Sequence, residues 1–372
     1  MLLTGIDQIS LVVTYPLKDL TFDSWDGVAK RLIVVIENTL KLDNIFGDRH
    51  RIDGVAHYSM VYGYGLTSPV FYIAYNPGSP STGILVYFSA NALNEYRLRF
   101  QEKYQVNVNA NDILSMLQDA GLSCHASRLD LYADYIDEDQ PIDLTALYNA
   151  LVSGSVKIVD HNGRRNASKL SSMSANDKVE TIYIGTRSKN TRALARIYDK
   201  KTEQLNNPYG FRKKTARTCS SWTRIEVELH SFYAKKLTSD LASCSSEDLQ
   251  AFIAATILSK YTLVYTENKS PLPFIEQLKA RRHSKDIILA YPSEGDRDLR
   301  RKYDYLISDS GLFSLIDMVS AVWGEMGVCI LMERLNADYE SHIMKRKTRD
   351  WIRKNRDNLA PYAPPFGEHG NE

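Results

Sequence analysis

Three short segments of this chain place charged and tyrosine side chains at every second position. Residues two apart in a strand point to the same side, so each segment predicts a strand with one polar face. The polar sets are Arg128, Asp130, Tyr132 and Asp134 in RLDLYAD; Arg224, Glu226, Glu228 and His230 in WTRIEVELH; and Arg196, Tyr198 and Lys200 in LARIYDK. If the three strands are neighbours, one sheet face gathers several carboxylates, a tyrosine and cations.

Such a face could act on phosphodiesters. Clustered carboxylate oxygens favour a hard divalent cation such as Mg²⁺ or Mn²⁺, and a metal of this kind polarises a phosphodiester oxygen. A tyrosine hydroxyl beside it could be the nucleophile, although its ordinary pKa of about 10 means that a metal or cation must assist. The alternative is a solvated strand face, which shows the same alternation.

Positive charge is concentrated in three parts of the sequence. Arg187–Arg217 holds ten Lys and Arg residues against Asp199 and Glu203, and two further clusters are Lys279–Lys285 and Lys345–Lys354. Local charge of this kind is typical of phosphate-backbone binding, and also of solvated surfaces. The net charge of +1 hides it, because 46 Lys and Arg nearly balance 45 Asp and Glu.

Composition places this 372-residue chain among ordinary globular proteins. Its four cysteines form no CxxC pair, no His-x-His occurs, and the first residues do not resemble a signal peptide. We therefore expect a cytoplasmic protein without a disulfide framework. The apolar stretch Gly311–Met332 contains Asp317 and Glu325, which predicts a packed helix and no membrane partner.

Strands and helices alternate in the first part of the sequence, and helices dominate the remainder. Expected strands are 6–15, 70–75, 83–89, 128–135, 180–185, 194–200 and 222–230, and expected helices are 24–42, 111–120, 237–265, 302–316 and 316–345. This order predicts an α+β fold with a helical C-terminal region. The segment after Leu359 is expected to be a disordered tail.

At these motifs the chain resembles the replication initiation factor family. Members are initiators of rolling-circle plasmids and phages and relaxases of conjugative elements. The resemblance covers residues 5 to 235 and rests on RLDLYAD, Glu180–Gln204, WTRIEVEL and the upstream GILVYFSANAL. It implies an antiparallel-sheet nicking domain, HUH-like or ferredoxin-like but without the His-x-His pair.

The resemblance also implies roles for individual residues. Tyr198 would attack the scissile phosphate to form a 5′-phosphotyrosine link, and the freed 3′-OH would prime replication. The metal carboxylates would be Asp130 with Glu226 or Glu228, and Asp134 is a further candidate. Arg196 would contact phosphate and Lys200 would stabilise the phenolate or the leaving group. Expected DNA contacts are Arg187, Lys189, Arg192, Lys201, Lys213 and Lys214.

The predicted organisation is a nicking domain over 1–235, a helical region over 236–358 and a tail over 359–372. Expected partners are an origin nick site, single-stranded or in a hairpin, a host helicase and a second copy of the chain. The helicase is expected because no P-loop is present. Two alternatives are a conjugative relaxase of the same family and a DNA-binding replication regulator without catalysis.

Overall fold

The protein is described from a computed structural model. The structure describes residues 1–16, 24–55, 58–65, 71–161, 163, 169–175, 177–186, 192–207, 210–281, 299, 302–303, 305–307 and 310–359. The chain forms two compact units, Met1–Leu289 and Ala290–Glu372, which are described separately below.

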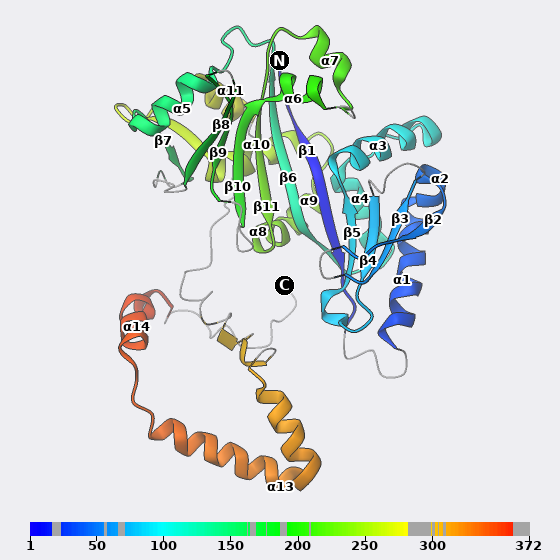
Figure 1. Ribbon diagram of the computed structural model, residues 1–372, viewed down its shortest axis with the longest axis vertical. Helices are drawn as coiled ribbons and strands as arrows, with labels where there is room; N and C mark the ends of the chain where they lie inside the picture. Colours follow the sequence, from blue (N-terminus) through cyan, green and yellow to red (C-terminus); the bar gives the residue numbers. More distant parts are fainter. Residues whose placement is uncertain are drawn as a thin grey trace. The chain divides into compact units, whose positions relative to one another are not determined.

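The first unit is built on a ten-stranded antiparallel sheet (Figure 1). Its order is β2-β3-β4-β5-β1-β6-β11-β10-β9-β8, and β7 and β12 form a separate two-stranded sheet. The strands are β1 (Leu2–Val13), β2 (Arg49–Ile52), β3 (Met60–Tyr64), β4 (Phe71–Tyr75), β5 (Ile84–Phe88), β6 (Cys124–Ile136), β7 (Val156–Val159), β8 (Leu170–Ala175), β9 (Lys178–Ile184), β10 (Ala193–Asp199), β11 (Trp222–His230) and β12 (Thr262–Tyr265). The predicted α+β fold with an antiparallel sheet is therefore confirmed.

The helices of this unit are α1 (Trp25–Leu40), α2 (Leu42–Phe46), α3 (Ala90–Tyr104), α4 (Ala110–Asp119), α5 (Leu144–Ser153), α6 (Lys200–Asn206), α7 (Lys213–Thr218), α8 (Phe232–Lys236), α9 (Thr238–Ala242), α10 (Leu249–Lys260) and α11 (Pro273–Ala280). Most of them pack on the apolar face of the sheet, whereas α6 lies beside the polar face and α7 adds no residue to the main core. α8 contacts β6 and β11, and α10 contacts β1 and β6. One continuous core results, and Ile225, Val227 and Leu229 of β11 lie in it as the alternation predicts.

Capping explains where two of the elements begin. Ser24 accepts a hydrogen bond from the backbone N–H of Gly27 and starts α1, close to its predicted start. Asp199, the last residue of β10, accepts from the N–H of Thr202 at 2.9 Å and starts α6. The chain therefore turns from strand to helix directly after Tyr198.

Two sequence-based assignments need correction. The single helix expected over 237–265 is instead two helices, α9 and α10, and it ends at Lys260, because Thr262–Tyr265, rich in β-branched and aromatic residues, forms β12 and pairs with β7. α3 is a helix that the pattern did not predict, since its sequence is largely polar and its few buried residues give only a weak apolar stripe.

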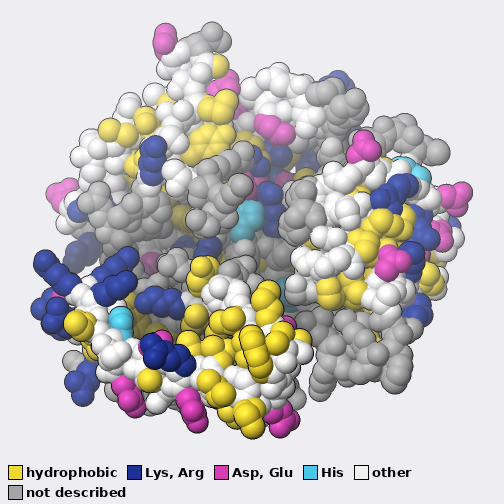
Figure 2. Space-filling view, turned by 60° about the horizontal axis from the view of Figure 1, so that its bottom comes forward, with side chains coloured by type: hydrophobic (Ala, Val, Ile, Leu, Met, Phe, Trp, Pro, Cys, Tyr) yellow, Lys and Arg dark blue, Asp and Glu magenta, His cyan; other side chains and the backbone are white. Residues whose placement is uncertain are grey.

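The second unit contains α13 (Leu312–Glu340) and α14 (Arg346–Leu359). Gly324 interrupts α13 with non-helical angles, φ 64° and ψ −159°. Contrary to the expectation of a packed helix, no residue of α13 is buried, and Figure 2 shows hydrophobic side chains gathered along it. The stretch Tyr305–Glu340 is long and apolar enough to cross a membrane, by length and composition only.

The two units divide at residue 289, whereas the sequence predicts a nicking domain that ends at 235. α9 to α11, which follow residue 235, pack with the sheet unit. The boundary at residue 235 was predicted for the nicking function and not for the compact unit, so it stays a prediction. The tail after Leu359 lies outside the described residues.

Candidate functional site

The three strands with polar faces are neighbours in the sheet, in the order β6-β11-β10. Their register pairs Asp130 with Glu228, Tyr132 with Glu226, and Asp134 with Arg224 across β6 and β11. On the other side of β11, Arg196 pairs with Glu226, and Tyr198 pairs with Arg224. Direct partners point to the same side of a sheet, so the predicted polar face exists.

This face is not solvated. Four of its charged side chains are almost completely buried: Asp130 is 3% exposed, Asp134 and Glu226 are 0%, and Arg224 is 1%. A charge removed from water must be paired or the fold loses several kcal/mol. The alternative of an ordinary solvated strand face is therefore wrong for these strands.

Tyr198 lies at the centre of the face, 5% exposed. Its hydroxyl donates a hydrogen bond to Glu226 Oε2 at 2.9 Å, and Arg196 Nη2 contacts the other oxygen of Glu226 at 2.5 Å. Burial, and after it the charge of Glu226, holds the pKa of the Tyr198 phenol well above its usual range. The phenol is therefore protonated at neutral pH and already bonded to a carboxylate that can accept its proton.

Two cationic groups flank the Tyr198 ring. The Arg196 guanidinium carbon lies 4.9 Å from the ring centroid, and Lys200 Nζ lies 5.5 Å from it. Lys200 is buried and forms an ion pair with Glu203 at 2.7 Å. Both cations are near enough to stabilise negative charge on the phenol oxygen.

Asp130 and Glu228 share one cation. Arg128 Nη2 lies 2.6 Å from Asp130 Oδ2 and 3.2 Å from Glu228 Oε2, so the guanidinium bridges two carboxylates on adjacent strands. Burial is the main cause that raises the pKa of Asp130 to about 6, and Glu226 and Glu228 add to it against the opposing effect of Arg128. The Arg128 guanidinium thus offsets only part of the effect of burial on Asp130.

This donor set fits a divalent cation in its chemistry. All-oxygen carboxylate ligands suit Mg²⁺ or Mn²⁺, and the bridging guanidinium stands where a shared cation would be. Among the described residues, no group of three or more His, Cys, Asp or Glu side chains is arranged to hold a metal. Asp130 and Glu228, which are direct partners on β6 and β11, are the two carboxylates that could hold such an ion.

Asp134 belongs to a different ion cluster. Arg224 contacts both of its oxygens, at 2.6 and 2.8 Å, and Arg212 Nη1 lies 3.3 Å from Oδ2. Arg224 also donates to Asp7 Oδ1 at 2.8 Å, and its guanidinium carbon lies 4.0 Å from the Tyr132 ring centroid. With both oxygens occupied, Asp134 is placed to support the face and not to join Asp130 and Glu228.

Asp7 was not identified from the sequence. It is the extra residue of a β-bulge, because Ile6 pairs with Leu131 while Gln8 pairs with Asp130. The bulge lets Asp7 and Gln8 both line the pocket, and Ile6 and Ile9 both lie in the core. Ile6 and Ile9 are three residues apart in a strand that otherwise alternates, and this spacing is the sequence signal that could have revealed the bulge.

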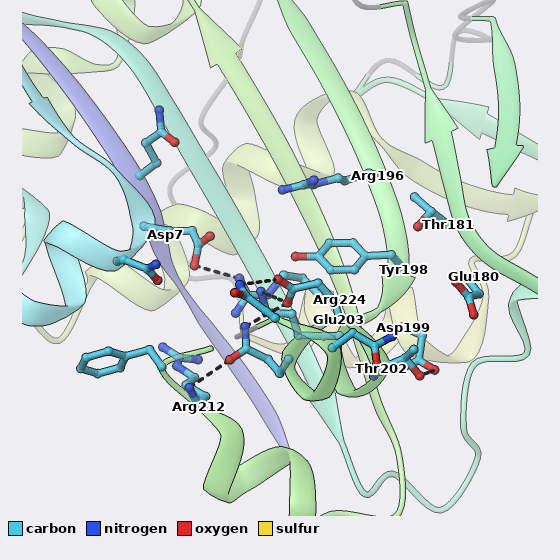
Figure 3. Close-up of a pocket in the computed structure, with 18 of the residues that line it drawn as sticks. Asp7, Glu180, Thr181, Arg196, Tyr198, Asp199, Thr202, Glu203, Arg212 and Arg224 are labelled. Carbon is cyan, nitrogen blue, oxygen red and sulfur yellow. Dashed lines mark hydrogen bonds and ion pairs between the residues drawn. The ribbon is translucent and has the colours of Figure 1, made fainter. Parts of the chain in front are cut away.

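A pocket of about 570 Å³ opens beside Tyr198 (Figure 3). Asp7 on β1 faces the Tyr198 hydroxyl across it, and Arg196, Arg212 and Arg224 line its walls. The N-terminus of α3, Ser89 to Asn91, forms part of the same lining. The Tyr198 side chain therefore borders the pocket together with three guanidinium groups and one carboxylate from β1.

The expected DNA-contact residues fall into three groups. Lys201 donates to the carbonyls of Cys219 and Ser220, at 2.8 and 3.1 Å, which ties it to the fold. Lys213 and Lys214 begin α7, and Arg192 directly precedes β10. Arg187 and Lys189 lie outside the described residues. Arg212, by contrast, lines the pocket although the sequence did not single it out.

Comparisons with known proteins agree with this geometry. A family model described as replication initiation factor matches residues 125–282, which include β6, β10 and β11. The chain is similar to the solved rolling circle replication initiator protein from Geobacillus stearothermophilus, with a TM-score of 0.52 and 14% identity, over 77% of this chain and 100% of that one. No curated protein matches. The predicted resemblance is confirmed, and the fold is that of the rolling circle initiator.

Removing Asp134 should destabilise the first unit strongly. Asp134→Ala leaves the buried guanidinium of Arg224 with one carboxylate instead of two, and loss of a buried ion-pair partner costs about 3–5 kcal/mol. Urea unfolding of the full chain measures this. Lys30→Ala, which breaks a surface pair with Asp26, is the control and should leave the free energy of unfolding nearly unchanged. Equal costs for the two variants would contradict the role given to the Asp134 cluster.

The raised pKa of Asp130 should appear in the pH dependence of stability. The folded state keeps a proton between about pH 4 and 6 that the unfolded chain has released, so this group lowers stability as the pH rises. In EDTA, the stability of wild type minus that of Asp130→Asn should fall by about 2 kcal/mol from pH 4 to pH 7. A difference independent of pH would show that Asp130 titrates normally.

Proposed function

We propose that this protein initiates rolling-circle replication by nicking and transferring a specific DNA strand, with Mg²⁺ or Mn²⁺, through a 5′-phosphotyrosine intermediate. The observation that carries the proposal is the buried Tyr198 hydroxyl, bonded to Glu226 at 2.9 Å beside a cation-lined pocket. The match to the replication initiation factor family over residues 125–282 supports the substrate class, a DNA origin.

Glu226 accepts the phenol proton in the proposed reaction. As the scissile phosphate enters the pocket, the Tyr198 oxygen attacks phosphorus and its proton passes to Glu226 Oε2. The bond from phosphorus to the 3′ oxygen breaks, which leaves a 5′-phosphotyrosine and a 3′ oxygen that takes up a proton to become the priming 3′-OH. Reversal of the same steps rejoins the strand.

Positive side chains offset the charge of this displacement. Arg196 and Lys200 lie within 6 Å of the Tyr198 ring and favour the developing phenolate. Arg196 also holds Glu226 through its second oxygen, which keeps Oε2 directed at the hydroxyl. Arg196 is therefore both a phosphate contact and a positioning residue in the proposal.

Asp130 and Glu228 would hold the divalent cation, which when bound polarises a phosphodiester oxygen. Glu226, predicted as an alternative ligand, is instead bonded to Tyr198 and Arg196, and this favours its use as the proton acceptor. Asp134, the remaining predicted ligand, supports Arg224.

Origin recognition would extend beyond the pocket. Arg192, Lys201, Lys213 and Lys214 are proposed contacts to the DNA backbone, together with Arg187 and Lys189 outside the described residues. The cationic α14 of the second unit is a further candidate for duplex or hairpin contact. Unwinding requires a host helicase, closure of the circle requires a second nucleophile such as that of a second copy, and the proposed location is the cytoplasm.

Tyr198→Phe should abolish covalent attachment. Wild type incubated with fluorescent single-stranded origin DNA and Mg²⁺ or Mn²⁺ should give a labelled protein band on a denaturing gel, and EDTA should remove it. Tyr183→Phe, a neighbouring tyrosine that lines the same pocket, is the matched control and should retain the band. A band that persists in Tyr198→Phe would assign the nucleophile elsewhere, and tight binding without any band in wild type would favour the regulator.

Glu226→Gln should slow nicking by about 10²–10⁴-fold, because the phenol loses its proton acceptor. The variant keeps the size of the side chain, and single-turnover nicking measures the effect. Activity should recover in part as the pH rises toward the pKa of the phenol. Glu180→Gln, another carboxylate of the pocket lining, should nick at nearly the wild-type rate. Equal rates in the two variants would exclude Glu226 as the base.

A further inference from the structure

Arg97 on α3 is a half-buried cation without a partner. Its Nε is shielded from solvent and has no hydrogen-bond partner, and its guanidinium forms no ion pair with any residue that the structure describes. The other arginines around the candidate site each pair with a carboxylate: Arg128 with Asp130, Arg196 with Glu226, and Arg212 and Arg224 with Asp134. Because a charge withdrawn from water without a partner lowers stability, the position of Arg97 needs an explanation.

The side of α3 that carries Arg97 is the side that lines the pocket beside Tyr198. Ala90, Asn91 and Asn94 of this helix belong to the pocket lining. Residues three or four apart on a helix share a side, so Arg97 continues this polar side by one turn after Asn94. The polar sequence of α3, which concealed the helix from the apolar pattern, therefore includes a side that faces the pocket.

A second guanidinium lies near Arg97. Burial is the main cause that lowers the pKa of Arg97, and the positive charge of Arg212 lowers it further against the opposing effect of Tyr132 and Asp7. Arg212 itself lines the pocket and donates to the Tyr132 hydroxyl at 3.1 Å. Two like charges brought together away from water repel each other, and an anion between them removes the repulsion.

The two arginines lie on a different part of the pocket wall from Tyr198. α3 contacts β1 and β5, whereas Tyr198 is on β10. β6 and β11 lie between β1 and β10, which separates those two strands by about 14 Å. Arg212 and Tyr198 accordingly occupy different walls of the pocket in Figure 3. An anion between Arg97 and Arg212 would thus be a second group, distinct from the phosphate that Tyr198 attacks.

We propose that Arg97 and Arg212 bind a second phosphate of the DNA strand, at the α3 end of the pocket. Guanidinium groups bind phosphate oxygens through paired N–H donors, and the N-terminus of α3 adds partial positive charge along the same wall. A strand held at this phosphate is fixed in position before its scissile phosphate meets Tyr198. This inference rests on the proposed function, since it takes the strand in the pocket to be DNA.

Binding without cleavage tests the second phosphate site, in the full chain carrying Tyr198→Phe and in EDTA. A fluorescent oligothymidylate is titrated at several NaCl concentrations and read by anisotropy. Arg97→Met should weaken binding by about tenfold at low salt and reduce the salt slope by about 0.7, the value for one phosphate contact on a single strand. Arg97→Lys keeps the charge but not the planar donors, so it should keep the slope and bind with intermediate affinity.

Arg99→Met is the matched control on the same helix. Arg99 is exposed and donates to the Ile45 carbonyl at 2.7 Å, so its guanidinium is already bonded to the fold. This variant should keep the parent affinity and salt slope. Unchanged affinity and slope in Arg97→Met, or an equal loss in Arg99→Met, would overturn the phosphate site.

Inorganic phosphate gives a readout that does not depend on DNA. In a buffer without phosphate or sulfate, Arg97→Met should leave the free energy of unfolding unchanged or raise it, because the repulsion from Arg212 is removed. Added phosphate should raise the unfolding temperature of the parent chain more than that of Arg97→Met. A purely structural role for Arg97 predicts the reverse, a destabilised variant with the same response to phosphate, and that result would overturn the proposal.

The two arms separate this inference from the proposed function. If the full chain bound no single-stranded DNA, the proposed function would fail, and the response to inorganic phosphate would still decide for or against the anion site. Loss of the covalent adduct in wild type would contradict nicking alone, since the binding measurements use a chain without the Tyr198 hydroxyl.

Discussion

The candidate site depends on one buried charge, the guanidinium of Arg224 in the middle of the ten-stranded sheet. Its side chain is 1% exposed, so without partners it would greatly lower the free energy of unfolding. Asp134 on β6 and Asp7 on β1 are the carboxylates that pair with it. Tyr132 packs against the same guanidinium, and a side chain at Gly5 would overlap the Tyr132 hydroxyl. These contacts of Arg224 and Tyr132 together fix the register of β1, β6 and β11.

Register is what converts these strands into a site. A shift of one residue along β11 would turn Glu226 and Glu228 into the core and expose Ile225 and Val227 in their place. The buried ion pairs and the apolar face oppose such a shift together. The hydrogen bond from Tyr198 to Glu226 is consequently fixed by the fold itself.

Much of this arrangement was predictable because strand alternation is local. The polar faces of β6, β10 and β11 follow from their sequences, and their adjacency could be inferred only by assuming that the polar faces meet. Burial was not predictable, since the same alternation describes a solvated strand. Asp7 and Arg212 escaped notice because their placement depends on a bulge and on tertiary packing, neither of which has a regular period.

The arginines that pair the buried carboxylates differ in how far the fold encloses them. Arg196 pairs with Glu226, Arg224 with Asp134 and Asp7, and Arg128 with Asp130 and Glu228. The Arg224 side chain is 1% exposed, whereas that of Arg128 is 31% exposed although it also bridges two carboxylates. Asp130 and Glu228 are therefore the carboxylates whose shared cation is most accessible to solvent.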